Sequence, residues 1–223
     1  HTRRPAKVTL PGPVTTEDSV LDKYYRGDEN SLAMRFAALL NRKAHDLAAA
    51  GADVIQFDEP SFNIYLDKVR AWGIEALEVA LEGLCCTTAI HICYSDGIPR
   101  VLAWKKRNTE WGQYALTLPL LAKTRVHQVS VECAASGVDA AVLAEARDKD
   151  VLLGVIDVGT EEVESPDLVA ERISKALAYV AAERLFPCTD CEVPRSRPSA
   201  RRKLKALVEG ARLVRGQLEA AKR

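Results

Sequence analysis

The stretch that decides the fold is Val151-Leu-Leu-Gly-Val-Ile-Asp-Val158. It is a near-continuous apolar run of strand length, as expected of a parallel strand covered by helices on both faces. Ser165, which follows, is a good helix N-cap, and Pro166 suits the first position of a helix. The sequence therefore predicts a strand at Val151–Val158 and then a helix at Ser165–Ala182.

The same strand-then-helix order recurs along the chain. We expect further strands at Lys7–Leu10, Asp53–Phe57, Thr88–Tyr94, His127–Glu132 and Leu185–Cys188. We expect further helices at Ser31–Ala50, Asp67–Cys85, Glu110–Leu121, Asp139–Arg147 and Ser199–Lys222. Together these segments make six βα units, and such alternation predicts a parallel sheet with right-handed crossovers.

A closed (β/α)8 barrel contains eight such units in roughly 250 residues. We therefore predict an α/β fold of the TIM-barrel type, in which this chain supplies about six units and the N-terminal units are absent. Residues 1–223 are expected to form a single catalytic domain. The alternative is an open doubly wound sheet, which is weakened because the chain has nothing like the phosphate-binding glycine fingerprint of that fold.

The composition excludes several classes of function. The 223 residues are 48% hydrophobic, and Lys+Arg and Asp+Glu are both 31, so charge gives no argument for nucleic acid or an acidic membrane as a partner. No apolar run is long enough to span a membrane. The six cysteines favour reduced cytoplasmic thiols or metal ligands over a disulfide framework. We expect the basic stretch Arg195–Lys205 to be solvated.

Three predicted strands end in residues that zinc prefers. His91 and Cys93 are two positions apart, so their side chains point to the same face of a strand. Glu132 ends a later strand and Cys191 follows another, and the carboxyl ends of parallel strands meet at one end of a barrel. Imidazole, thiolate and carboxylate suit a tetrahedral zinc site. Cys188 forms a C-x-x-C with Cys191 and stays an alternative ligand.

Six short motifs occur in a set order. They are Leu10-Pro-Gly-Pro-Val-Thr15, Gln56-Phe-Asp-Glu-Pro60, His91-Ile-Cys93-Tyr94, Val131-Glu132, Gly154-Val-Ile-Asp157 and Asp190-Cys191. Each motif is weak alone, but the ordered set is specific and resembles the C-terminal catalytic barrel of cobalamin-independent methionine synthase. The resemblance covers about residues 7–215 and is closest to the short forms of that family, which lack the large N-terminal folate-binding domain.

The resemblance implies a cytoplasmic, zinc-dependent methyltransferase that acts on the thiol of homocysteine and forms methionine. It implies the zinc ligands His91, Cys93, Glu132 and Cys191. It also implies that Asp58 holds the amino group of homocysteine. We take Asp58 and Glu132 as candidate catalytic residues, Glu132 being the ligand that the substrate displaces. Glu59 and Asp157 are further candidates for substrate binding.

Two positions depart from the long enzymes of the family. Gly159 stands where those enzymes place a histidine that protonates the departing folate nitrogen, and the region near Ser19 lacks their pterin-binding indole. The methyl donor is therefore expected to be a corrinoid protein or a methyl-folate delivered by a helper protein. The missing N-terminal segment is a further expected partner.

Two other functions stay open. One is a related zinc alkyltransferase that acts on another thiol, such as coenzyme M. Asp58 argues against it, because a sulfonate group would call for a cation at this place. The other is a barrel in which zinc is structural and no reaction is catalysed, since four protein ligands also suit a closed structural site.

Overall fold

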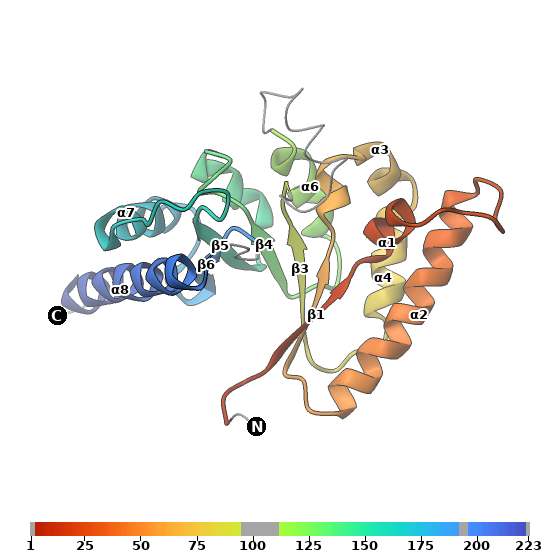
Figure 1. Cartoon of the computed structure of the whole chain (residues 1–223), viewed down its shortest axis with the longest axis horizontal. Coiled ribbons are helices and arrows are strands. Elements are labelled where there is room, and N and C mark those ends of the chain that lie inside the picture. Colours follow the sequence, from red (N-terminus) through yellow and green to blue (C-terminus); the bar gives the residue numbers. More distant parts are fainter. Residues whose placement is uncertain (1–2, 95–111, 192–195, 222–223) are drawn as a thin grey trace. The chain divides into compact units, whose positions relative to one another are not determined.

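The structure is a computed structural model that describes residues 3–94, 112–191 and 196–221 (Figure 1). Its strands are β1 (Lys7–Pro11), β2 (Val54–Asp58), β3 (Thr87–Ile92), β4 (Gln128–Val131), β5 (Asp150–Ile156) and β6 (Leu185–Thr189). They form one sheet in the order β1-β2-β3-β4-β5-β6. The pairs β1–β2, β2–β3 and β5–β6 are parallel. An order that never reverses is that of a barrel wall and not of a doubly wound sheet, so the predicted fold class is confirmed.

The described residues fall into two compact units. Unit 1 contains residues 3–94 and 113–129, and unit 2 contains residues 112, 130–191 and 196–221, so that β4 contributes to both. Each unit has buried apolar side chains of its own, such as Phe57 in unit 1 and Val155 in unit 2. That the chain forms a single domain stays a prediction.

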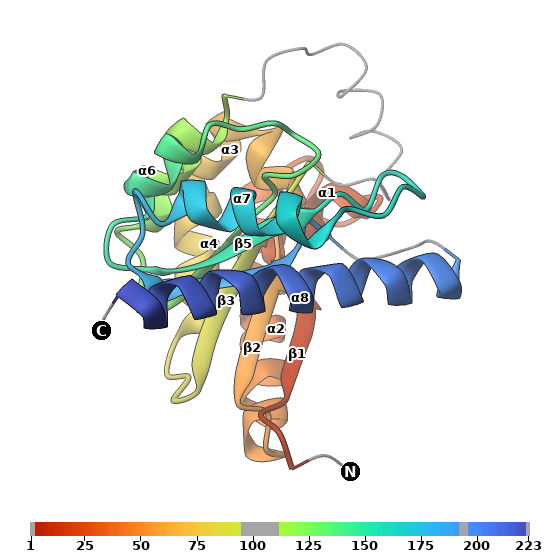
Figure 2. The same ribbon diagram turned by 90° about the vertical axis from the view of Figure 1, so that its left-hand side faces the viewer.

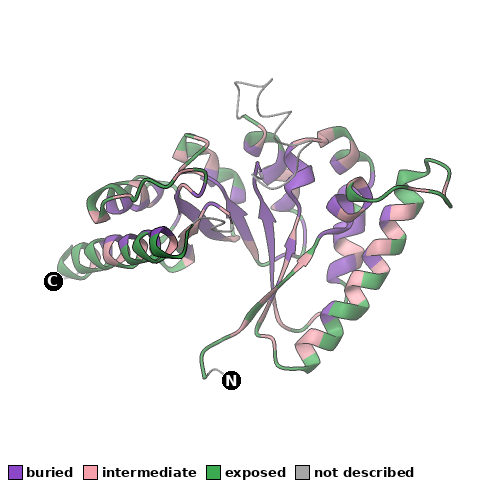
Figure 3. Ribbon diagram, viewed as in Figure 1, coloured by how far each residue is buried: buried purple, intermediate pink, exposed green. Residues whose placement is uncertain are grey.

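Unit 1 places its helices around β1, β2 and β3. The helical elements are α1 (Pro13–Ser19), α2 (Glu29–Ala49), the 3-10 turn η1 (Pro60–Asn63), α3 (Leu66–Lys68), the π-helical turn η2 (Val69–Gly73), α4 (Ile74–Leu81) and α6 (Tyr114–Leu121). Helix α2 packs against α1, α4 and β2. In Figure 3 much of the outward side of α2 is exposed, whereas Ile55 and Ile90 of the strands are fully buried.

The helix predicted at Asp67–Cys85 is broken into three parts, α3, η2 and α4. Gly73 lies at the junction of η2 and α4, where a Cβ atom would come within 3.2 Å of the Val14 side chain, so glycine allows α1 to approach closely. The helix ends at Leu81 because Glu82 has a non-helical ψ of 129° and Gly83 has a positive φ of 70°. Glu110, where the next helix was predicted to begin, lies outside the described residues.

Unit 2 contains the 3-10 helix η3 (Ala140–Ala146), α7 (Pro166–Ala176), the short turn η4 (Ala182–Arg184) and α8 (Arg197–Ala221). The Ser165 hydroxyl accepts a hydrogen bond from the Leu168 N–H at 3.1 Å, which confirms the predicted cap, although α7 is shorter than predicted. Helices α7 and α8 run side by side (Figure 2). None of the helices in the described part of the chain has the length and apolar character needed to cross a membrane.

Candidate metal centre

His91 and Cys93 lie at the carboxyl end of β3 in unit 1. Their residues are 8% and 1% exposed. The His91 carbonyl oxygen accepts a hydrogen bond from the Glu59 N–H at 2.8 Å, and the Cys93 carbonyl oxygen accepts one from the Asn63 side chain at 3.5 Å. The backbone of both candidate ligands is therefore held by the segment that follows β2.

A second set of contacts supports the same strand end. The Tyr114 hydroxyl on α6 donates to the Ile92 carbonyl oxygen at 2.9 Å. The rings of Tyr114 and Tyr94 pack edge to face, with their centroids 5.2 Å apart. The sequence indicated neither role, because nothing in the local pattern around Tyr114 relates it to a strand more than twenty residues earlier.

Asp58 and Glu59 follow each other at the end of β2 but have different surroundings. Asp58 is half-buried, and its Oδ1 accepts a hydrogen bond from the Gln56 side chain at 2.7 Å. Glu59 is fully buried, and its oxygens accept bonds from the Val14 N–H (2.9 Å), the Thr15 N–H (2.8 Å) and the Thr15 hydroxyl (2.7 Å). The Glu59 carboxylate is thus bound to the start of α1 by hydrogen bonds, while its contact with a substrate stays a prediction.

Burial raises the pKa of Glu59 from 4.5 to about 7. The hydrogen bonds from Thr15 and Val14 lower this pKa, and the nearby charge of Asp58 adds to the rise. Gly12 makes the arrangement sterically possible, because a Cβ atom there would lie 2.2 Å from the Glu59 Cδ.

Glu132 and Cys191 lie in unit 2. Glu132 directly follows β4 and is 3% exposed, whereas Cys191 follows β6 by two residues and is half-buried. Asp190, between β6 and Cys191, is 1% exposed. Burial raises the pKa of Asp190 to about 7, against the lowering effect of hydrogen bonds from Ala134 and Ala135. No role for this carboxylate was predicted from the sequence.

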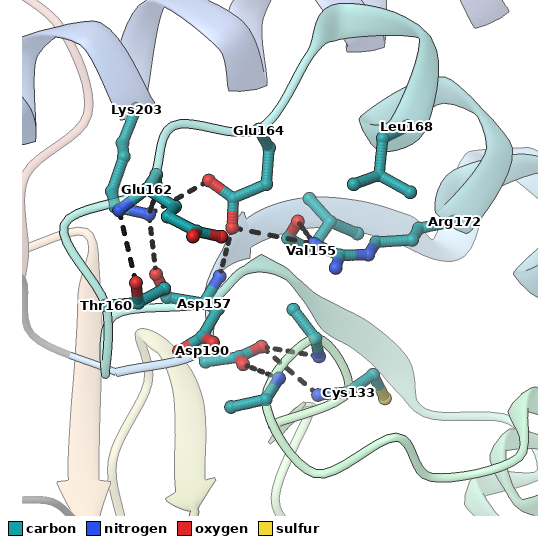
Figure 4. A network of polar contacts seen from close by, with 12 residues as sticks. Cys133, Val155, Asp157, Thr160, Glu162, Glu164, Leu168, Arg172, Asp190 and Lys203 are labelled. Carbon is teal, nitrogen blue, oxygen red and sulfur yellow. Dashed lines mark hydrogen bonds and ion pairs between the residues drawn. The ribbon is translucent and has the colours of Figure 1, made fainter.

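Asp157 directly follows β5, and its backbone is held on both sides (Figure 4). Its N–H donates to the Glu164 Oε1 at 2.7 Å, and its carbonyl oxygen accepts from the Lys203 Nζ at 2.9 Å. The Lys203 Nζ also donates to the Glu164 Oε2 at 3.0 Å and to the Glu162 carbonyl oxygen. Lys203 is fully buried, so the prediction of a solvated basic stretch is wrong at this residue.

Three of the four predicted zinc ligands form a group that could hold a metal ion. Among the residues that the structure describes, this group consists of His91, Cys93 and Cys191 and includes neither Glu132 nor Cys188. One imidazole and two thiols suit zinc and are unlike the all-oxygen sites of magnesium or calcium. The donor set therefore fits zinc, and the complete ligand set stays a prediction.

Known proteins are similar to this chain in sequence and in fold. The family described as "Cobalamin-independent synthase, Catalytic domain" matches residues 1–213. A methionine synthase of Saccharolobus islandicus is 31% identical over 216 residues, which are 96% of this chain and 59% of the relative. The chain thus spans about three-fifths of the length of the curated relatives that it matches.

Two solved structures extend the comparison. A B12-independent methionine synthase from Shewanella sp. W3-18-1, in complex with selenomethionine, is 46% identical with a TM-score of 0.93, and the match covers 98% of this chain and 64% of that one. A putative vitamin-B12 independent methionine synthase from Listeria monocytogenes is 17% identical with a TM-score of 0.68, over 97% of this chain and 65% of that one. This second likeness is one of fold alone.

Proposed function

Because the chain belongs to the cobalamin-independent synthase catalytic-domain family, we propose that it carries the catalytic centre of an enzyme that methylates homocysteine and so forms methionine. The zinc ion, the substrate and the methyl donor are all part of this proposal, because the chain spans only 59% of the length of the Saccharolobus relative. The observation that carries it is the group His91, Cys93 and Cys191, whose donors suit a zinc ion that binds a thiol.

We place zinc on His91, Cys93, Cys191 and Glu132. Zinc bound there would lower the pKa of a coordinated thiol, so that the substrate sulfur is nucleophilic at neutral pH. Glu132 is the ligand most easily displaced by that sulfur, because a carboxylate is harder than a thiolate. The burial of Cys93 and Glu132 would keep water away from both groups.

Asp58 is the residue that we propose binds the substrate ammonium group. It ends β2 and is half-buried, so its carboxylate can accept a charge-assisted hydrogen bond from an ammonium group while it is still partly exposed to solvent. Asp157 at the end of β5 is the second candidate contact. The Shewanella neighbour, 46% identical, was solved in complex with selenomethionine, which is the selenium analogue of the proposed product.

The methyl donor is proposed to be a methyl-corrinoid protein or a methyl-folate delivered by a helper protein. Gly159 offers no side chain that could protonate a departing folate nitrogen, and its own N–H donates to the Asp157 Oδ1 at 2.7 Å. General acid catalysis contributes roughly 10²–10⁴-fold, so we expect slow turnover with methyl-folate alone. Fast turnover with methyl-folate and no second protein would refute this part of the proposal.

Metal analysis of single cysteine variants tests the zinc site. Cys93→Ser and Cys191→Ser should each lose most of the zinc that the wild-type protein binds. Cys85→Ser is the matched control, because Cys85 is exposed and outside the metal-binding group, and should keep full occupancy. Cys188→Ser should also keep its zinc. Full zinc occupancy in the first two variants would refute the assignment.

A substitution of Asp58 separates substrate binding from metal binding. Asp58→Asn keeps the size of the side chain but removes the charge that faces the ammonium group. A hydrogen bond to a charged group contributes about 1.5–3 kcal/mol, so the affinity for homocysteine should fall by about ten- to a hundredfold. Zinc content should stay unchanged. An unchanged affinity for homocysteine would exclude Asp58 from the substrate site.

A further inference from the structure

One buried carboxylate, that of Asp190, joins three segments of unit 2 (Figure 4). Its Oδ1 accepts hydrogen bonds from the N–H groups of Cys133 at 3.2 Å and Ala134 at 3.0 Å, and its Oδ2 accepts one from Ala135 at 2.6 Å. Its own N–H donates to the Ile156 carbonyl oxygen at 3.0 Å. Asp190 therefore ties the end of β6 to the turn after β4 and to the end of β5.

Two proposed zinc ligands are chain neighbours of the residues in these contacts. Glu132 directly precedes the turn that Asp190 binds, and its carbonyl oxygen accepts a hydrogen bond from the Ser136 hydroxyl at 2.7 Å. Cys191 directly follows Asp190 in the chain. Because the backbone fixes where each side chain begins, one carboxylate constrains the separation of these two ligands.

The surroundings of Asp190 are fitted to this contact. A Cβ atom on Gly154 would lie 2.2 Å from the Asp190 Oδ1 and 2.9 Å from the Val131 carbonyl oxygen, so a side chain at this position of β5 would force its neighbours to shift. Burying a carboxylate costs free energy, and the three converging N–H groups offset part of this cost, as in an anion-binding nest. Closing a turn needs no buried charge, since an exposed side chain such as Asp139 caps η3 in the same unit.

We propose that Asp190 is a positioning residue of the zinc site, which holds Glu132 and Cys191 at the separation that the metal requires. The inference rests on the proposed function, because it presumes that zinc binds these two residues. In this role Asp190 contacts neither metal nor substrate and acts through the backbone of the ligands. Groups that orient metal ligands in this way typically contribute about 10–100-fold to metal affinity.

Two variants of Asp190 and a matched control test the proposal in the purified protein. Asp190→Asn keeps the size of the side chain but turns an amide NH2 group toward one of the three N–H donors. Asp190→Glu keeps the charge and shifts the carboxylate by one methylene. The control is Asp139→Asn, which changes an exposed carboxylate that accepts a backbone hydrogen bond from the Ala141 N–H at 3.0 Å and is not a proposed ligand.

Two measurements are made on each protein. Zinc affinity is obtained by competition with a chromophoric chelator. The visible spectrum of the cobalt(II)-substituted protein reports the geometry of the metal ligands, which a loss of global stability alone would not alter. We expect both Asp190 variants to bind zinc about 10–100-fold more weakly and to show shifted cobalt bands, while Asp139→Asn matches the wild type on both counts.

A folded Asp190 variant with wild-type zinc affinity and wild-type cobalt bands would overturn the proposal. If Asp190→Asn does not fold, as judged by circular dichroism, Asp190→Glu decides by the same criteria. A wild-type protein that binds no zinc would overturn both this inference and the zinc site of the proposed function. Normal zinc binding in the wild type and in both Asp190 variants would overturn this inference alone.

Discussion

Replacing Lys203 by methionine tests how firmly the end of β5, and with it Asp157, is held. The Lys203 ammonium group is fully buried and donates to the Asp157 carbonyl oxygen at 2.9 Å, to the Glu162 carbonyl oxygen and to the Glu164 Oε2 at 3.0 Å. Methionine nearly preserves the volume of the lysine stem but removes all three donors. The substitution therefore isolates the polar contribution of the side chain.

The structure sets the expected size of the effect. The Glu164 side chain is 93% buried. Among the described residues, Arg172 at 3.6 Å is the cation that still pairs with Glu164 when Lys203 is replaced. Removing one partner of a buried ion pair costs about 3–5 kcal/mol. Because Arg172 still compensates part of the charge, we expect a loss of about 3 kcal/mol in the free energy of unfolding. That is a large share of the roughly 5–15 kcal/mol by which proteins are stable.

Urea unfolding at pH 7, followed by circular dichroism, measures this loss. The control is Lys205→Met, since Lys205 lies on the same helix with 74% of its side chain exposed and pairs with Glu209 at 3.6 Å, so its removal should change little. In the double variant Lys203→Met with Glu164→Gln, at least about 1 kcal/mol should return, because no unpaired charge is left buried. If Lys203→Met is as stable as Lys205→Met, the buried ion pair does not hold this part of unit 2.

Two further substitutions test the buried carboxylate of unit 1 and the crowded glycine of unit 2. The pKa of Glu59 is about 7 in the folded state against 4.5 in the unfolded chain, so the folded state holds the proton more tightly. The protonated side chain therefore stabilises the folded state below pH 4.5, and this contribution is lost as the pH rises to 7. Relative to Glu59→Gln, the wild type should therefore lose about 3 kcal/mol across that range, and a pH-independent difference in urea unfolding would contradict this. Gly154→Ala should lower the free energy of unfolding by about 1–3 kcal/mol, as followed by thermal unfolding, because the new Cβ atom would overlap Asp190. Gly216→Ala is the control and should not destabilise the protein, because the space around Gly216 is open. Equal melting temperatures for these two alanine variants would show that the contact at residue 154 is not tight.

Local patterns in the sequence were enough to locate the strands. Each predicted strand overlaps an observed one, as Asp53–Phe57 does with β2 at Val54–Asp58. The reason is that buried parallel strands are short apolar runs between breakers, and both signals are local. The family resemblance is also confirmed, because its motifs lie where these strands end and the family match covers nearly the whole chain.

The helices were predicted less well because their ends depend on partners. Helix α7 stops at Ala176, six residues before the predicted end. The residues of η3, predicted as an α-helix, form a 3-10 helix that begins at the Asp139 cap. Lys203 was misjudged for a similar reason, since it stands among basic residues while its acceptors lie 39–46 residues away along the chain. Burial of this kind is set by tertiary packing, which a local charge pattern does not encode.

The two units hold their candidate site residues by the same physical means. In unit 1, Glu59 directly follows Asp58, and in unit 2, Asp190 directly precedes Cys191. Each of the two carboxylates is buried and accepts three hydrogen bonds from a segment that follows another strand.

In both units a glycine leaves room for the carboxylate. A Cβ atom on Gly12 would lie 2.2 Å from the Glu59 side chain, and one on Gly154 would lie 2.2 Å from that of Asp190. Strand ends are joined to loops, which are the more mobile parts of a fold. Hydrogen bonds from several backbone donors to one buried carboxyl group fix such an end more firmly than apolar packing, because hydrogen bonds are directional and apolar packing is not. We therefore expect the reactive side chains to depend on these two carboxylates for their positions, although neither carboxylate needs to touch the substrate.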